Sequence, residues 1–476
     1  MERPTRFYSS LGLLIVLNAL IKPAWVFVID RQVQNEVGVS IYGAYFSLLS
    51  LSVVFSFLLD WGLTVFFNRQ LAIQDQSFLH QPGNFLLVKL LFALQYTVLV
   101  FAAAAIAGIE RWDILAAVVI IQILSSLFLF LRAIVTAHQW FRQDAWLSII
   151  DKGLMILLGG TLLYFPAWLG GISIERFGWL QVGCLLVAVL LSVGLLLARN
   201  IRFTIRRPAF PSRELFRMAA PYALAVLLMS AHSRLDAFLL DRLNNNGAYE
   251  AGIYAAAYRL LDAGNIVGFL VAAFLLPFIA REWSKKKNIG ELLLPARHFL
   301  LMFAIGVSSI TIFMAPWIQD ILYHHQDDKA VSVLQWCLPA LIGYSLTHIY
   351  GTALTATGYI ASFCKMLIAS VALNLVLNLL LIPSLGAMGC CIAALSSQVL
   401  TGIGVTMYAR QKLQINLHSR SLVIYLLTAV LLCGGLYLAG QHNINKWWLI
   451  GGATMTTLLI MLWAGFFKPG LLRMRG

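Results

Sequence analysis

The chain has 476 residues, of which 60% are hydrophobic and only 11% are charged, and its mean hydropathy is +0.83. Soluble globular proteins carry roughly 25% charged residues, so this composition excludes an ordinary soluble protein. The formal net charge is +14. A polytopic membrane protein explains both observations, because its loops collect basic residues, which attract anionic lipid head groups. We therefore expect membrane lipids, and no nucleic acid, among the partners.

Apolar segments separated by polar breaks follow one another along the whole chain. A helix of about 20 apolar residues is long enough to cross the hydrocarbon core of a bilayer. The segments show none of the alternation of apolar and polar residues that is typical of strands. We predict an all-α polytopic protein with about fourteen transmembrane helices, centred near Val16, Val54, Gln95, Leu124, Met155, Ala188, Leu228, Leu270, Ile305, Ile342, Val371, Leu395, Val430 and Thr457.

The basic residues predict the orientation of these helices, because Lys and Arg accumulate in short cytoplasmic connections. Two basic runs, "RNIRFTIRRPAFPSRELFR" at 199–217 and "REWSKKKNIGELLLPAR" at 281–297, fall on the same side as both ends of the chain. Each connection on the other side carries one basic residue at most. An even number of spans with both termini in the cytoplasm is consistent with every connection.

A polar segment at 201–214 divides the chain into two halves. We predict an N-terminal lobe of helices one to six at 1–200 and a C-terminal lobe of helices seven to twelve at 215–410. The last two helices, at 411–476, are expected to be peripheral. The segment "IYGAYFSLL" at 41–49 aligns without gaps with "IYAAAYRLL" at 253–261, and the same register places Arg69 opposite Arg281.

Parallel repeats of six helices, related by an axis along the membrane normal, are a known transporter architecture with the substrate site between the halves. The repeat therefore predicts two lobes around a central cavity. Chance similarity between two apolar helices is the alternative explanation.

Five charged residues lie within the predicted outer half of the membrane: Lys22, Arg234, Asp236, Arg259 and Asp262. A charge that faces lipid costs several kcal/mol, so such residues normally face a helix bundle or a wet cavity. We interpret the three basic residues as a cationic lining that binds an anionic cargo. The two aspartates would balance this charge or take up a coupling cation. Alternatively, the four charges of the hairpin brace two adjacent helices, and Lys22 extends to the outer interface.

Asp60 lies toward the cytoplasmic end of the second helix, where two roles are open. It is either a charge-balancing gate residue or a capping partner for the following loop.

No motif in the sequence points to a catalytic site or to a cofactor. The chain has no phosphate-binding Gly-Lys-Ser/Thr loop, no zinc-binding helix motif, and no nucleophile with a matching base. The stretch "HHQDD" at 324–328 is interpreted as a solvated turn, and the six cysteines show no metal-type spacing. We therefore expect no metal, no cofactor and no enzymatic activity. A membrane-embedded glycan ligase or polymerase is the disfavoured alternative.

Several motifs carry a resemblance to a known family. They are "YGAYFSLLS", "LLDWGLTVFFNRQLA", "RLDAFLL", "AGIYAAAYRLLD", "LLPFIAR", "ALTATGY" and "NLVLNLLLIPSLGAMGCCIAALSSQV". Together they resemble the polysaccharide repeat-unit (O-antigen type) flippases of the multidrug, oligosaccharidyl-lipid and polysaccharide exporter (MOP) superfamily. The resemblance extends from about Leu11 to about Arg410.

The resemblance implies two six-helix lobes that export a lipid-linked glycan by alternating access. The cargo would be a polyprenyl-pyrophosphate-linked oligosaccharide for cell-surface polysaccharide or lipopolysaccharide, and a proton or sodium ion would be the coupling partner. It also implies a location in the bacterial cytoplasmic (inner) membrane. Cationic residues in the first and eighth helices are a feature of such exporters, so it supports Lys22 and Arg259 most.

The number of spans leaves the cargo open. Many members of the family have twelve spans, whereas this chain has fourteen predicted spans, like the lipid II flippases. A flippase for lipid II, the peptidoglycan precursor, and a cation-coupled multidrug exporter of the same superfamily therefore remain alternatives.

Overall fold

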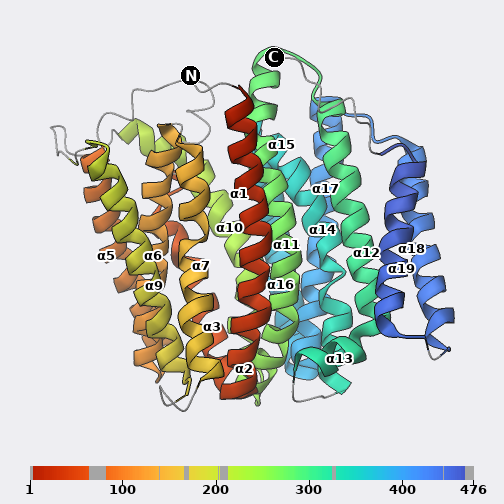
Figure 1. The fold of residues 1–476 in the computed structure, drawn as a ribbon, viewed down its shortest axis with the longest axis horizontal. Coiled ribbons are helices and arrows are strands. Elements are labelled where there is room, and N and C mark those ends of the chain that lie inside the picture. The colour runs from red at the N-terminus through yellow and green to blue at the C-terminus, as the bar shows by residue number, and fades with distance from the viewer. Residues whose placement is uncertain are drawn as a thin grey trace. The chain divides into compact units, whose positions relative to one another are not determined.

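The computed structural model describes residues 4–63, 82–138, 140–165, 171–201, 203, 213–323, 328–442 and 444–466. The regular elements within these ranges are all helices (Figure 1). Several sequence predictions concern residues outside the described ranges: Arg69, most of the linker 201–214, and the first four residues of "HHQDD".

The N-terminal part of the chain begins with helices interrupted by short π and 3₁₀ segments. Its elements are α1 (Pro4–Ala24), the π-helix η1 (Trp25–Asp30), α2 (Arg31–Val37), α3 (Val39–Phe55), the 3₁₀-helix η2 (Ser56–Leu59), α5 (Pro82–Ile106), α6 (Trp112–Ala137), α7 (Phe141–Tyr164), α9 (Ile174–Ala198) and α10 (Arg213–Leu243).

The C-terminal part continues the same all-helical pattern. Its elements are α11 (Gly247–Ser284), α12 (Gly290–Leu322), α13 (Asp328–Cys337), α14 (Ala340–Leu346), the π-helix η3 (Thr347–Gly351), α15 (Thr352–Ala356), α16 (Ile360–Leu385), α17 (Ala387–Leu413), α18 (Ser419–Gly440) and α19 (Lys446–Trp463). Every predicted span centre lies inside one of these helices.

Twelve helical segments among the described residues are long and apolar enough to cross a membrane, judged by length and composition. They correspond to the second to thirteenth predicted spans. The helices α1 and α19 stand at the first and fourteenth predicted spans but are not among the twelve. For α19 the reason is composition, because its 18 residues include Lys446 and three tryptophans, residue types that favour the membrane interface. The predicted all-α polytopic fold class is confirmed.

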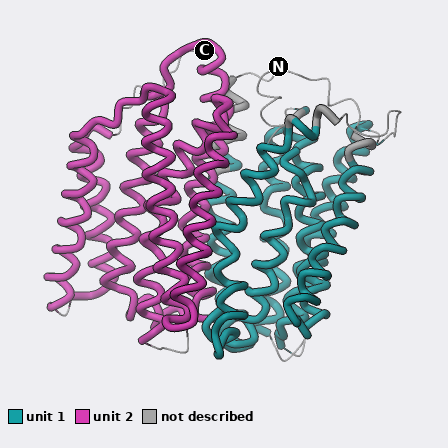
Figure 2. The backbone as a smooth tube through the Cα atoms, turned by 180° about the vertical axis from the view of Figure 1, so that it is seen from behind, with its two compact units in different colours: residues 1–252 teal, residues 253–476 magenta. Residues whose placement is uncertain are grey.

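The contacts within the chain divide it into two compact units, residues 1–252 and 253–476 (Figure 2). In unit 1, α1 packs along α7, α6 along α9, and α3 along α10. In unit 2, α17 packs against α16 and α14, while α18 and α19 pack against α12. The boundary between the units falls inside α11. The predicted lobes and their pseudo-twofold relation stay predictions.

A π-helical segment directly follows Pro23, the penultimate residue of α1. Proline has no backbone N–H, so it removes one hydrogen bond of the helix and distorts the turn around it. The following segment, η1, buries Trp25, Val26, Ile29 and Asp30. The change of helix type therefore begins at Trp25, three residues after Lys22.

Two glycines mark the closest crossing of helices in unit 1. A Cβ atom on Gly43 of α3 would lie 1.9 Å from the carbonyl oxygen of Ala248 and 2.5 Å from the amide nitrogen of Gly252. A Cβ atom on Gly252 would lie 2.1 Å from the carbonyl oxygen of Val39. Small residues allow such close backbone approach between membrane helices. The start of α11 is thereby held directly against α3.

Candidate functional site

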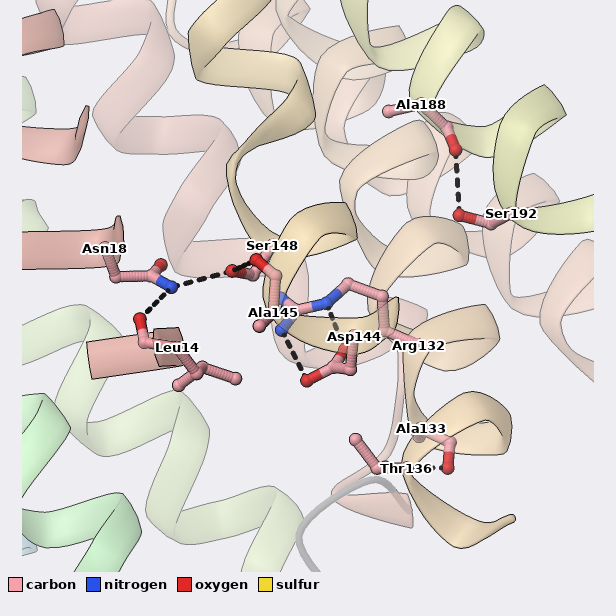
Figure 3. Close-up of polar contacts among 10 residues, drawn as sticks. All are labelled: Leu14, Asn18, Arg132, Ala133, Thr136, Asp144, Ala145, Ser148, Ala188 and Ser192. Atoms are coloured by element: carbon pink, nitrogen blue, oxygen red, sulfur yellow. Dashed lines mark hydrogen bonds and ion pairs between the residues drawn. The ribbon is translucent and has the colours of Figure 1, made fainter. Parts of the chain in front are cut away.

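Unit 1 contains a cluster of charged side chains from α1, α6 and α7, which we call the α7 cluster. Its members are Lys22, Arg132, Asp144, Asp151 and Lys152. Asp144 and Asp151 are seven residues apart and therefore lie on one face of α7, two turns from each other. The guanidinium of Arg132 forms a two-pronged ion pair with Asp144, with Nε 2.7 Å from Oδ1 and Nη2 3.1 Å from Oδ2 (Figure 3).

Lys152 and Asp151 form the second charged pair of the α7 cluster. The ammonium nitrogen of Lys152 lies 3.3 Å from Oδ2 of Asp151. The same nitrogen lies 4.9 Å from the centre of the Trp25 ring, a distance at which a cation is attracted to the aromatic face. Because Trp25 belongs to η1, this contact connects the π-helical segment to α7.

Lys22 is the member of the α7 cluster for which the described residues supply no direct partner. It lies in the last turn of α1 and is half-buried. It interacts electrostatically with Arg132, Asp151, Lys152 and Asp144. Among the described residues it makes no hydrogen bond and no ion pair. Its three donors are therefore available to a ligand.

A hydrogen bond between neutral side chains ties α1 to α7 next to Lys22. Nδ2 of Asn18 donates to Oγ of Ser148 over 2.7 Å and to the carbonyl oxygen of Leu14 over 2.8 Å (Figure 3). Asn18 is one turn before Lys22, and Ser148 lies between Asp144 and Asp151 on the same face of α7. Both Asn18 and Ser148 are buried. This bond fixes the register of α1 against α7. It thereby sets the position of Lys22 along α7, relative to the carboxylates of that helix.

The α7 cluster contains three cations and two carboxylates, which leaves one positive charge in excess. Burying a charge inside a membrane protein is costly unless the charge is paired or solvated. Arg132 and Lys152 are each paired with a carboxylate, so the excess charge resides at Lys22. A basic side chain without a paired carboxylate binds phosphate oxygens well. Lysine does so as a compact point charge and arginine through a planar fork.

The sequence analysis identified Lys22 but missed the other four members of the α7 cluster. Two features of the sequence could have identified these residues. Arg132 interrupts the apolar run "LFLFLRAIV", and the segment "DAWLSIIDKGLM" places two aspartates seven residues apart inside a predicted span. Charges inside a predicted membrane helix are functional candidates by default.

Two further predicted site residues of unit 1, Arg234 and Asp236, lie on α10. The guanidinium carbon of Arg234 is 6.0 Å from the centre of the Phe46 ring on α3, which is a cation–π distance. Asp236 is 1% exposed. Two residues apart on a helix, Arg234 and Asp236 point in different directions.

Arg259 and Asp262 lie on the part of α11 that belongs to unit 2, and both are half-buried. Their spacing of three residues places them on neighbouring positions of one helix face. A shared cationic lining of Lys22, Arg234 and Arg259 stays a prediction.

Asp60 takes part in a buried ion pair at the end of η2. Its Oδ1 lies 2.5 Å from Nζ of Lys89 on α5, and the same nitrogen donates to Oγ of Ser126 on α6 over 2.9 Å. Lys89, which the sequence analysis did not single out, is 7% exposed. The backbone turns sharply here, with φ of 47° at Trp61 and 69° at Gly62. The ion pair thus holds α5 and α6 to the point where the second membrane helix breaks.

The comparisons with known proteins identify the fold. No family model matches the chain, and no curated protein matches its sequence. Solved structures do match. A MOP superfamily transporter from Pyrococcus furiosus has 12% identity and a TM-score of 0.62, with 86% of this chain and 95% of that chain covered. The Vibrio cholerae MATE transporter VcmN, in its bent form, has 15% identity and a TM-score of 0.58, with 86% and 98% covered.

A third solved structure is an inward-facing multidrug resistance MATE family transporter of the MOP superfamily. It has 14% identity and a TM-score of 0.61, with 85% of this chain and 94% of that chain covered. The chain therefore has the fold of the MATE transporters of the MOP superfamily. The superfamily fold that the sequence motifs implied is confirmed, whereas the flippase branch is not distinguished by these matches.

Proposed function

We propose that this protein is a membrane transporter that moves a polyprenyl-pyrophosphate-linked oligosaccharide from the cytoplasmic to the outer leaflet by alternating access. In this role it supplies cell-surface polysaccharide synthesis in the bacterial cytoplasmic membrane. It carries out transport and no covalent chemistry. Lys22, Arg234 and Arg259 bind the pyrophosphate and any acidic sugars, and Asp236 and Asp262 balance their charge.

The observation that carries this proposal is the excess positive charge of the α7 cluster at Lys22. A half-buried ammonium without a partner among the described residues favours an anionic ligand over a cationic one. The pyrophosphate of a lipid-linked sugar is the part of such a cargo that is always charged, whatever the glycan. Reversible binding is consistent with the nearby carboxylates Asp144 and Asp151, which weaken the attraction for an anion.

The structural matches provide a precedent for a change of cargo on this fold. The Pyrococcus furiosus transporter is described as having a binding pocket of reverse polarity, which suggests a different function for that protein. A fold shared with drug exporters is therefore compatible with a cargo of another charge.

A cation-coupled multidrug exporter is the second candidate function, favoured by the multidrug resistance MATE transporter among the matches. The two carboxylates Asp144 and Asp151 would then serve a coupling proton or sodium ion. A lipid II flippase shares the pyrophosphate chemistry of the first proposal and differs from it in the attached sugars.

Transport by the purified full-length chain in proteoliposomes distinguishes the two functions. One assay follows a fluorescent polyprenyl-pyrophosphoryl N-acetylglucosamine, which becomes protected from a membrane-impermeant quencher when it changes leaflet. The other follows efflux of ethidium under an imposed proton or sodium gradient. We expect flipping of the lipid-linked sugar above the rate of protein-free liposomes, and no efflux of ethidium. Efflux of ethidium without flipping would establish the exporter instead.

Variants of Lys22 test the role of the excess charge. We expect Lys22→Gln to reduce flipping at least about tenfold, the loss that corresponds to one charge-assisted contact with phosphate. Lys22→Arg keeps the charge and should retain most of the activity. Because Lys22 has no partner within the described structure, neither variant should lower the melting temperature appreciably. Full activity of Lys22→Gln would show that Lys22 does not bind the cargo.

A further inference from the structure

Unit 2 contains a buried arginine whose charge the described residues do not balance. Arg297 lies two turns after the start of α12 and is 3% exposed. Nη1 of Arg297 donates to the hydroxyl oxygen of Tyr350 over 3.5 Å. Nε and Nη2 are buried and find no hydrogen-bond partner within the described part of the chain. No carboxylate from the described residues forms an ion pair with this guanidinium.

Polar and aromatic groups from η3, from α18 and from the residues after α19 lie around Arg297 and its neighbour His298. Tyr350 belongs to the π-helix η3, and π-helical turns occur frequently at functional sites. Tyr425 of α18 interacts electrostatically with Arg297, and its hydroxyl lies 2.6 Å from Nδ1 of His298. The His298 ring stacks on Phe466, with 3.6 Å between the ring centres. The guanidinium therefore lies where α12, η3 and α18 meet.

The unpaired donors of Arg297 require an acceptor from outside the described residues. A guanidinium stays protonated in any protein environment, so burial does not neutralise it. An isolated buried charge is strongly unfavourable unless an opposite charge or several hydrogen bonds compensate it. The hydroxyl groups of Tyr350 and Tyr425 supply neutral polar contacts but no negative charge. The missing compensation is an anion.

We propose that Arg297, Tyr350 and Tyr425 form a binding site for a phosphate group. The fork of the Arg297 guanidinium matches two oxygens of a phosphate, and a tyrosine hydroxyl can donate to a third. This site is separate from the α7 cluster, which belongs to unit 1, and it does not depend on the proposed cargo. The phosphate comes either from the head group of an anionic membrane lipid or from free phosphate.

The position of the site favours the lipid as the source of the phosphate. Arg297 is seven residues after the start of α12, which corresponds to roughly 10 Å along the helix. This start follows the exposed lysines of 285–287, and on α18 the apolar side chains of Leu422 and Leu426 are 49% and 69% exposed. A lipid with its phosphate at Arg297 would place its acyl chains along such a surface.

Ligand titration of the delipidated full-length chain in a neutral detergent tests this proposal. The melting temperature is followed with phosphatidylglycerol, with inorganic phosphate, and with diacylglycerol, which has no phosphate. A ligand that binds only the folded state raises the melting temperature. We expect a rise of several degrees with phosphatidylglycerol and none with diacylglycerol. An equal rise with inorganic phosphate at the same concentration would identify free phosphate as the source.

Three variants test whether phosphatidylglycerol binds at Arg297 and Tyr350. Arg297→Gln should weaken phosphatidylglycerol binding at least about tenfold, as measured by native mass spectrometry. Tyr350→Phe removes one hydroxyl, leaves the arginine in place, and should weaken binding less. Arg420→Gln, which removes an exposed basic residue at the start of α18, is the matched control and should keep the full response. An unchanged response in both Arg297→Gln and Tyr350→Phe would overturn the proposal.

Discussion

Individual charged residues in this protein differ mainly in whether they have a partner. Arg132 is held by both oxygens of Asp144, and the two side chains are 19% and 4% exposed. Lys22 of the same cluster has no hydrogen-bond or ion-pair partner among the described residues. A paired charge is expected to contribute to stability and an unpaired charge to binding, because only the unpaired donors are free to contact a ligand.

The Arg132–Asp144 pair is predicted to be structural. We expect Arg132→Gln to lower the free energy of unfolding by about 2 to 4 kcal/mol, because it leaves the Asp144 carboxylate buried without its partner. The double variant Arg132→Met with Asp144→Leu removes both charges and should lose less stability than Arg132→Gln alone. Denaturation of the micelle-solubilised protein measures these variants together with the single variants Arg132→Met and Asp144→Leu. If the double variant is as unstable as the sum of both single variants, the two residues are not coupled.

Arg259 is predicted to bind cargo. We expect Arg259→Gln to abolish flipping without preventing membrane insertion, because the cargo loses a charge-assisted contact with its pyrophosphate. A purely bracing arginine would instead leave Asp262 without compensation and mainly lower stability.

The double variant Arg259→Gln with Asp262→Asn separates the two possibilities for Arg259. It relieves an uncompensated carboxylate, but it does not restore a cation for the cargo. Flipping should therefore stay low in the double variant when it is measured in the proteoliposome assay. Recovery of flipping would show that Arg259 is a bracing residue.

At the scale of helices, two features of the sequence allow neighbouring helices to pack closely. Small residues bring backbones together, as at Gly43 and Gly252 in unit 1. Buried amide side chains then link neighbouring helices, as in unit 2, where Nδ2 of Asn374 on α16 donates to Oγ of Ser397 on α17 over 3.4 Å. Both devices are expected inside a membrane, where lipid is as apolar as the side chains and burial alone does not drive association.

The crossing of α3 and α11 gives a prediction about packing. Gly43→Ala should destabilise the protein by about 1 to 3 kcal/mol or more, because the added methyl group would overlap the backbone of α11. Gly183→Ala on α9 is the control, since nothing lies within 4 Å of a Cβ atom at that position. It should be neutral or slightly stabilising, because alanine is the better helix former. Equal melting temperatures for the two variants would contradict the close crossing.

At the scale of the whole molecule, the chain is divided into two compact units, and each contains charged residues within its membrane helices. Unit 1 contains the α7 cluster, Arg234 and the Asp60–Lys89 pair, and unit 2 contains Arg259 and Arg297. The division falls inside α11, the helix that carries the second copy of the repeated segment.

The orientation of the whole chain is predicted from its basic residues and can be tested with introduced cysteines. Asn245 and Lys286 are both exposed, in connections on either end of α11. We expect Asn245→Cys to react with a membrane-impermeant maleimide added outside intact cells, and Lys286→Cys to react only after the membrane is permeabilised. The parent protein, in which five of the six cysteines are buried, gives the background. Labelling of both positions from the same face would refute the topology with both termini in the cytoplasm.

The sequence by itself determined the class of protein and the position of its helices. All fourteen predicted centres lie in helices because the length of an apolar segment is a local property, which the bilayer thickness converts directly into a span. The family motifs also pointed to the superfamily fold that the solved structures share. Lys22 could be selected because a charge beside a proline in an apolar helix is conspicuous without any knowledge of its neighbours.

Only the tertiary structure decided which polar and charged side chains are paired. Arg132 with Asp144, Asn18 with Ser148, and Lys89 with Asp60 join residues from different helices. Such pairs depend on how each helix is rotated about its axis and which helix packs beside it, and hydrophobicity does not encode either. The burial of Arg297 could not be predicted from the sequence either. The sequence placed Arg297 in a basic connection, whereas the structure buries it within α12. The physical reason is that a span is specified by local composition, whereas a partner is specified by packing at long range.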